Sequence, residues 1–298
     1  MDRAPITAVL ITLNEEHNLA YCLRSLRSWC DEIIVVDMLS EDRTPEIAAR
    51  YADLVLPHER IMAFDRARGA GIDRARNEWI VVVDADELIP PRLGRWIADW
   101  VRQGPLHDVA LLPRVNVFLG RWIRSSNWWP GLPRLFRRQS MRISDQLHRG
   151  LQPVPGARVK RLPKDPQLSI WHFSYGSLDS LTEKTNRYTT IEARQAIARG
   201  RPSPRPWRLF PKALRALWSD YVMRRGYRDG MAGLTYAINR AYYRYLSMAK
   251  RWDERHAPGR QARYHQMREE ILRGYMATDG SADVASSDAP LTDRSQDS

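Results

Sequence analysis

Short apolar runs alternate with helix-like segments through the first 90 residues, and this alternation constrains the fold more than any other feature. The runs at 6–13, 32–37 and 53–57 are typical of buried strands. A helix-like stretch at 64–76 leads into WIVVVDADE, whose continuous apolar run is typical of a strand covered on both faces. Alternating strands and helices predict an α/β fold with a mostly parallel sheet flanked by helices.

Charge divides the chain into unlike parts. The whole chain carries a net charge of +12, but residues 1–110 carry −6, residues 111–276 carry +22 and residues 277–298 carry −4. An acidic first third and a basic remainder indicate separate tasks, the second facing a polyanionic partner. We expect a first domain at 1–176, a basic helical region at 177–276 that faces such a partner or a membrane surface, and a disordered acidic tail at 277–298.

The cysteines and the start of the chain indicate its compartment. Cys22 and Cys30 are the two cysteines, and their spacing predicts one face of a single helix at a separation too long for a disulfide. The first residues lack the pattern of a signal peptide, and no run reaches the 18 apolar residues of a membrane span. We therefore expect a cytoplasmic protein that does not span a membrane.

Polar side chains follow three of the predicted strands. In such sheets, ligands bind beyond the carboxyl ends of the strands, where these side chains are expected to converge. Three carboxylate-bearing loops at one edge predict a cation, or a ribose and base, between them. The residues are Thr12, Asn14 and Glu15, then Asp37, Ser40, Asp42 and Thr44, and finally Asp84, Asp86 and Glu87.

The sequence VVVDADE contains the sharpest motif. In an extended chain, Asp84 and Asp86 point the same way, and the small Ala85 leaves their approach clear. Two such carboxylates suit Mg²⁺ or Mn²⁺ with open positions for phosphate oxygens. The alternative is that this acidic strand end only caps the following helix.

The second strand ends in a carboxylate suited to a nucleoside. Asp37 can accept from a pyrimidine imide or from ribose hydroxyls, and the 12–15 loop can line the other side of the base. The alternative is that Asp37 and Ser40 only form a turn and a cap. The glycine-rich fingerprint of dinucleotide-binding proteins is matched only by GAGIDR at Gly69, which follows no clear strand, so NAD or FAD is not expected. The motifs of zinc proteases, Walker-type ATPases and serine hydrolases are absent from the sequence.

These motifs together resemble the donor half of family 2 glycosyltransferases with the GT-A fold. The likeness rests on ITLNEE, VVDMLSEDRTPEIA and EWIVVVDADE, and it continues through NWWPGLPRLFRR, LHRG and WHFSYGSLDSLTEKTNRYTTIEA. It covers most of residues 5–252 and is strongest to the bacterial lipopolysaccharide-core β-glucosyltransferase branch. It implies inverting, metal-dependent transfer of a sugar from a nucleoside diphosphate, with a lean to uridine, to an envelope glycan or lipid.

The resemblance also implies roles for individual residues. It puts Thr12, Asn14, Glu15, Asp37 and Ser40 in the nucleotide-sugar site, Arg68 near the diphosphate, Asp84 in both the nucleotide and the metal site, and Asp86 and His172 at the metal. The sequence departs from the family at three positions: Arg43 replaces a usual glycine, Gly131 a common aspartate and Arg149 a common glutamate.

Because Arg149 stands where the family commonly has a glutamate, the assignment of the catalytic base is weakened. The base takes the proton of the acceptor hydroxyl, so it must reach that hydroxyl. Asp145 is the first candidate and Glu87 the second. His148 is expected to position the diphosphate or the acceptor, or only to pack.

The basic half contains two amphipathic helical patterns. We expect most of each apolar stripe to form the core between helices, while the surrounding arginine and aromatic residues suit an anionic membrane surface. The stripes are Leu214, Leu217, Trp218, Tyr221 and Val222, and then Met231, Leu234, Ile238, Ala241, Tyr245 and Ala249.

Three alternatives remain open at this point. A polyprenyl-phosphate glycosyltransferase would use the same donor half. A non-catalytic membrane-surface protein would keep the fold without turnover. A nucleic-acid binder would suit the net charge, but the sequence lacks the motifs of known nucleic-acid modules, so no nucleic acid is expected. The sugar, the acceptor and the oligomeric state are left open.

Overall fold

The computed structural model describes residues 3–61, 64–124, 131–143, 150–205, 207 and 209–278. The chain folds into two compact units, residues 1–251 and residues 252–298. The first unit contains the sheet and the candidate site. The expected domain boundaries at residues 176 and 276 stay a prediction.

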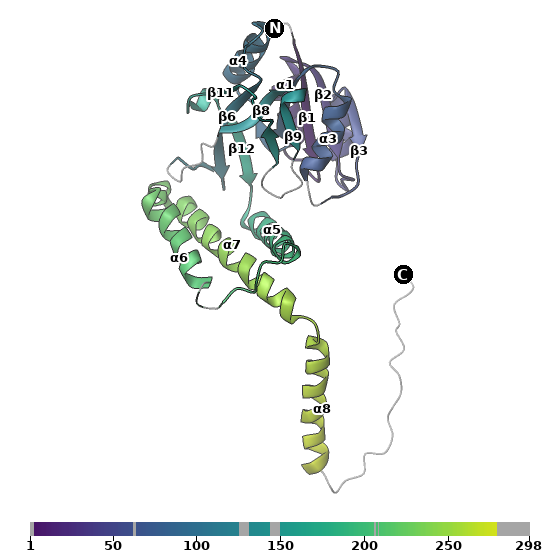
Figure 1. The fold of residues 1–298 in the computed structure, drawn as a ribbon, viewed down its shortest axis with the longest axis vertical. Helices are drawn as coiled ribbons and strands as arrows, with labels where there is room; N and C mark the ends of the chain where they lie inside the picture. Colours follow the sequence, from purple (N-terminus) through teal and green to yellow (C-terminus); the bar gives the residue numbers. More distant parts are fainter. Residues whose placement is uncertain are drawn as a thin grey trace. The chain divides into compact units, whose positions relative to one another are not determined.

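A mostly parallel sheet forms the centre of the first unit (Figure 1). Its first four strands pair in parallel in the order β3-β2-β1-β4, and β8 then runs antiparallel to both β4 and β6. The strands are β1 (Ala4–Thr12), β2 (Cys30–Asp37), β3 (Leu54–Pro57), β4 (Trp79–Asp84), β5 (Glu87–Leu88), β6 (Val109–Phe118), β7 (Arg121–Trp122), β8 (Gly131–Arg137), β11 (Val159–Arg161) and β12 (Ile170–Tyr175). The predicted α/β fold is confirmed.

Helices cover both faces of this sheet. The helices α1 (Leu19–Arg27), α2 (Thr44–Tyr51) and α4 (Pro91–Arg102) pack on one face, where Leu10 of β1 joins their core. The helix α3 (Phe64–Arg74) packs on the other face, where Val9 meets Ile72. Successive β1 side chains therefore enter opposite cores, which explains why the whole strand is apolar. The paired strands β9 (Met141–Ile143) and β10 (Leu151–Pro153) lie beside α3.

Three further helices complete the first unit. Phe118 of β6 packs with Leu181 and Tyr236, which joins the sheet to two of these helices. The helices are α5 (Leu178–Ala198), α6 (Leu209–Trp218) and α7 (Gly230–His256), and α8 (Arg260–Thr278) follows in the second unit. Single helical turns occupy Arg138–Ser140, Pro166–Leu168, Ser219–Met223 and Gly226–Asp229.

One local expectation and one alternative are wrong. Cys22 lies in α1, but Cys30 begins β2, because the helix ends at Arg27; both thiols are free and buried. The acidic end of β4 does not cap α4, which follows Pro90 and has no side-chain cap. The carboxylates of Asp84 and Asp86 therefore do not serve as helix caps for α4.

The apolar stripes of the basic half are also placed differently from the expectation. None of their residues is buried; α7 instead buries Ala232, Gly233, Tyr236, Ala237 and Met248. The start of α7 packs closely on the turn before it, since a Cβ on Gly233 would lie 2.0 Å from the carbonyl oxygen of Gly226. The residues of the predicted stripes are exposed or half-buried.

The packing of α3 on the sheet yields a test of the fold. A Cβ on Gly71 would lie 2.6 Å from Val9 Cγ1 and 3.0 Å from Val36 Cγ2. We expect Gly71→Ala to lower the free energy of unfolding by about 1–3 kcal/mol, because the methyl group overpacks the core. Urea denaturation measures the change.

Gly176→Ala is the matched control, because a Cβ there meets nothing within 4 Å. Its effect should stay within about 0.5 kcal/mol. An exchange of Gly for Ala inside a helix normally stabilises by roughly 0.5–1 kcal/mol. A stabilised Gly71→Ala protein would contradict this close packing.

Candidate active site

The loops after β1 and β2 are bonded to each other around Asp37. The Asp37 carboxylate accepts from Thr12 Oγ1 at 3.0 Å, from Ser40 Oγ at 2.6 Å and from the Ser40 N–H at 3.0 Å. Only 6% of Asp37 is exposed. The expected turn at Asp37 and Ser40 is therefore present, and it fixes the direction of this carboxylate.

Asn14 and Glu15 complete the joined loops. Asn14 has a left-handed φ of 56°, and its Oδ1 accepts from the Glu41 N–H at 2.8 Å. The Glu15 N–H donates to Thr44 Oγ1 at 2.8 Å, so Thr44 ties the loop instead of capping α2. The structure thus brings together the five residues predicted for the nucleoside: Thr12, Asn14, Glu15, Asp37 and Ser40.

Two arginines hold Asp84 at the end of β4. Arg68 of α3 donates to Asp84 Oδ1, and Arg134 of β8 donates to Asp84 Oδ2 at 2.5 Å. Burial raises the pKa of Asp84, but the charges of Arg134 and Arg68 outweigh it and hold that pKa well below its usual range. Both Asp84 oxygens therefore have cationic partners within the chain.

Glu87 is the second carboxylate of this network. It is fully buried, and its Oε1 accepts from Arg134 at 3.1 Å and from Arg114 of β6 at 3.2 Å. Its Oε2 accepts from the Asp84 N–H at 3.0 Å. These contacts favour a positioning role for Glu87 over the expected role as base, since a base must reach the acceptor hydroxyl.

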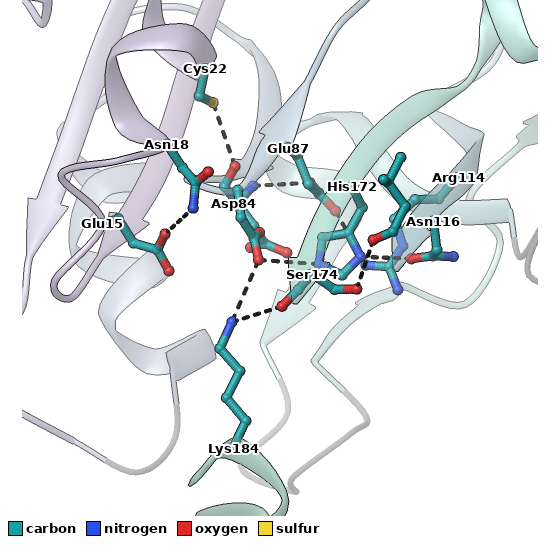
Figure 2. Close-up of polar contacts among 12 residues, drawn as sticks. Glu15, Asn18, Cys22, Asp84, Glu87, Arg114, Asn116, His172, Ser174 and Lys184 are labelled. Carbon is teal, nitrogen blue, oxygen red and sulfur yellow. Dashed lines mark hydrogen bonds and ion pairs between the residues drawn. The ribbon is translucent and has the colours of Figure 1, made fainter. Parts of the chain in front are cut away.

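Asp86 has a separate set of partners, of which His172 and Lys184 are labelled in Figure 2. Its Oδ2 lies 3.3 Å from His172 Nε2 on β12 and 3.9 Å from Lys184 Nζ on α5. Burial raises the pKa of Asp86, but His172 and Lys184 lower it, and the net shift is downward. The strand ends at Asp84, so the extended geometry assumed for both aspartates stops before Asp86.

The pair formed by Asp86 and His172 fits a divalent cation. His172 Nδ1 donates to Asn116 Oδ1 at 2.6 Å, which turns Nε2 toward the Asp86 carboxylate. A ligating histidine is normally oriented by such a second hydrogen bond. One carboxylate and one imidazole, completed by phosphate oxygens and water, form a reasonable donor set. Within the described residues, no cluster of three or more such ligands occurs.

Glu15 faces this cluster from the nucleoside side. Burial and the nearby Asp86 carboxylate raise its pKa above the usual value, and the Asn18 amide donates to its Oε2 at 2.9 Å. Figure 2 places Glu15 and Lys184 on the same side of the acidic strand end. The nucleoside loops and the Asp86 cluster therefore form one continuous site.

Three residues of this site receive no role from the sequence, although Arg134 and Lys184 lie in segments that carry the family resemblance. Arg134 and Arg114 lie on β8 and β6, and Lys184 lies on α5, all far along the chain from Asp84. Their proximity depends on the antiparallel insertion of β8 and on the docking of α5. The expected base Asp145, together with His148 and Arg149, lies outside the described residues.

Comparisons with known proteins agree with this geometry. Residues 7–151 match the family described as Glycosyl transferase family 2. A lipopolysaccharide core biosynthesis glycosyltransferase, LpsC of Rhizobium meliloti, is 26% identical over 86% of this chain and 94% of its own. An uncharacterized glycosyltransferase of Rickettsia bellii is 22% identical over 82% and 85%.

Solved structures give more distant likenesses. The mannosyltransferase PcManGT from Pyrobaculum calidifontis, in complex with GDP-Man and Mn²⁺, is 15% identical with a TM-score of 0.48, covering 85% of this chain and 88% of its own. S. aureus TarS 1–349, in complex with UDP-GlcNAc, is 13% identical with a TM-score of 0.47, covering 85% and 92%.

The sheet order gives an α/β domain with carboxylates at the ends of its parallel strands. Residues 7–151 of that domain match glycosyltransferase family 2, and the chain is a glycosyltransferase. His172 and Lys184 lie beyond the matched residues, so the site extends past the part of the chain that the family match covers.

The buried network yields a second test. We expect Glu87→Gln to lower the free energy of unfolding by roughly 3–5 kcal/mol, because it removes a buried negative charge that Arg114 and Arg134 both bind, although Arg134 keeps its ion pair with Asp84. Urea denaturation measures this loss.

The control is Glu78→Gln, which removes an ion pair with Arg137 at a carboxylate that is 63% exposed. That change should stay within about 1 kcal/mol. A fully stable but inactive Glu87→Gln enzyme would instead favour the role of Glu87 as base.

Proposed function

We propose that the chain transfers a sugar from a nucleoside diphosphate sugar, first of all a UDP-sugar, to an envelope glycan or glycolipid such as a lipopolysaccharide core, with inversion at the anomeric carbon. The observation that carries this proposal is the cluster of Asp86, His172 and Lys184 beside the loops that hold Asp37. Such a cluster can bind a diphosphate next to a nucleoside. The name of the LpsC relative supports the choice of acceptor.

The donor diphosphate needs positive charge around it. We assign Asp86 and His172 as the ligands of Mg²⁺ or Mn²⁺, which when bound would offset the charge of the leaving group. Lys184 approaches the same Oδ2 oxygen of Asp86 and is positioned to bind a phosphate oxygen. When the donor binds, Arg68 can leave Asp84 and bind the diphosphate instead. Asp84 keeps its contact with Arg134 and lines the nucleotide site.

The chemical step we propose is an in-line displacement. The acceptor oxygen forms a bond to the anomeric carbon as the bond from that carbon to the phosphate oxygen breaks, and the electron pair leaves with the nucleoside diphosphate. A carboxylate accepts the hydroxyl proton, and Asp145 remains our first candidate for it. Glu87 and Arg134 hold Asp84 in place during this step.

The proposed site of action is the inner face of the cell membrane. Envelope lipids present their headgroups there, and the basic half of the chain suits an anionic surface. No helix among the described residues is long and apolar enough to cross a bilayer. A polyprenyl phosphate is the alternative acceptor, and radiolabelled transfer to lipid phosphates or to core glycolipids separates the two.

Calorimetric titration tests the donor site. We expect one of UDP, GDP and dTDP to bind in the presence of Mn²⁺, and Asp86→Ala to weaken that binding at least tenfold, about 1.4 kcal/mol. The control Asp99→Ala removes an exposed carboxylate of α4 and should bind like wild type. If no nucleotide binds under any metal condition, the proposal fails.

Lys184 gives an independent test of diphosphate binding. We expect Lys184→Met to weaken UDP by about fivefold to a hundredfold, roughly 1–3 kcal/mol for a charge-assisted hydrogen bond, and Lys184→Arg to restore much of the loss. UMP, which lacks the second phosphate, should respond less. Lys160→Met, at an exposed lysine of β11, is the control. Equal loss of UMP and UDP binding would contradict a contact to the diphosphate.

A further inference from the structure

Helices α6 and α7 expose large apolar side chains on their outer surfaces. On α6 they recur every four residues, and on α7 they lie opposite the buried residues Ala232, Tyr236 and Ala237. Both helices therefore have a solvent-facing apolar row. We call these residues the apolar face: Phe210, Leu214, Trp218, Met231, Ile238 and Tyr245, with exposed fractions of 37% to 72%.

The two rows form one surface. The rings of Phe210 on α6 and Tyr245 on α7 lie 6.4 Å apart, centroid to centroid. Figure 1 shows α6 running alongside α7. Contiguous exposed apolar surface on a soluble protein generally marks an interaction site, whereas single exposed residues do not.

Positive charge surrounds the apolar face. Residues 205–251 contain 11 Lys and Arg residues against two Asp residues. One of these, Asp220, is buried and paired with Arg224 and Arg240. Lys212 and Arg215 lie among the apolar residues of α6 and are exposed. The surface is thus both apolar and strongly basic.

This combination selects between possible partners. A second copy of the chain would bring the same arginine and lysine side chains against each other, and like charges oppose that contact. Nucleic acid would satisfy the charge but leave the apolar side chains in water. An anionic bilayer satisfies both, because aromatic and aliphatic groups enter the interface while Lys and Arg contact headgroups.

We propose that the apolar face docks on the surface of an anionic lipid bilayer. Phe210, Leu214 and Trp218 would insert between headgroups, with Lys212 and Arg215 at the phosphate level. This inference extends the proposed membrane acceptor, but it does not depend on sugar transfer, so its failure and the failure of the donor proposal are separable.

Vesicle co-sedimentation of the full chain tests the docking surface. We expect wild type to partition onto phosphatidylglycerol-containing vesicles on the order of tenfold more strongly than onto pure phosphatidylcholine, with partial loss in high salt. The double variant Phe210→Glu, Leu214→Glu should lose at least about tenfold of that binding. Leu106→Glu, at a side chain 74% exposed in the loop after α4, adds one negative charge outside the apolar face and should bind like wild type.

Further measurements separate a loss of membrane binding from a loss of folding or a change of oligomeric state. UDP calorimetry on the double variant should match wild type, which shows that the fold and donor site are intact. If that variant does not fold, Lys212→Glu, Arg215→Glu replaces it, with loss expected only on anionic vesicles. Equal vesicle binding by wild type and the folded variants would overturn the proposal. So would a wild-type dimer, seen by light scattering, that the variants convert to monomer without any vesicle binding.

Discussion

The buried ion network of Glu87, Arg134 and Asp84 is the contact on which the site depends. Glu87 follows Asp84 by three residues, whereas Arg134 comes from β8, the antiparallel neighbour of β4, so the network joins β4, β5 and β8. The fully buried Glu87 and the half-buried Asp84 repel each other unless guanidinium groups lie between them. Arg134 supplies that charge to both. The β4 end therefore keeps a fixed direction, which leaves Asp86 as the carboxylate that faces the remainder of the site.

The two aspartates of the DADE segment have different binding partners. Asp84 has two arginine partners, whereas Asp86 has an imidazole and an ammonium group. Two positions apart in sequence, they meet different electrostatic environments, because the strand stops between them. The spacing alone suggests that both aspartates bind the metal, whereas these contacts support our proposal that Asp84 is a positioning residue and Asp86 a ligand.

The sheet and the nucleoside loops could be predicted because their signals are local. Buried parallel strands are continuous apolar runs, and Asp37 and Ser40 form a turn with a short-range pattern. Arg134 and Lys184 could not be found in this way, since only the strand order and helix docking bring them to Asp84 and Asp86. The apolar stripes misled for a different reason. Periodicity identifies a face, but α7 has apolar residues on two faces, and its small residues Gly233 and Ala237 make the buried one.

The position of Lys184 affects how this enzyme can be recombined with others. The helix α5 that contains it lies outside residues 7–151, yet its ammonium group reaches Asp86. His172 on β12 also comes from beyond that boundary. A chimera joined at residue 151 would preserve the recognisable domain and separate Asp86 from both partners. A junction that preserves both contacts therefore has to follow α5, which lies beyond the residues that match the family.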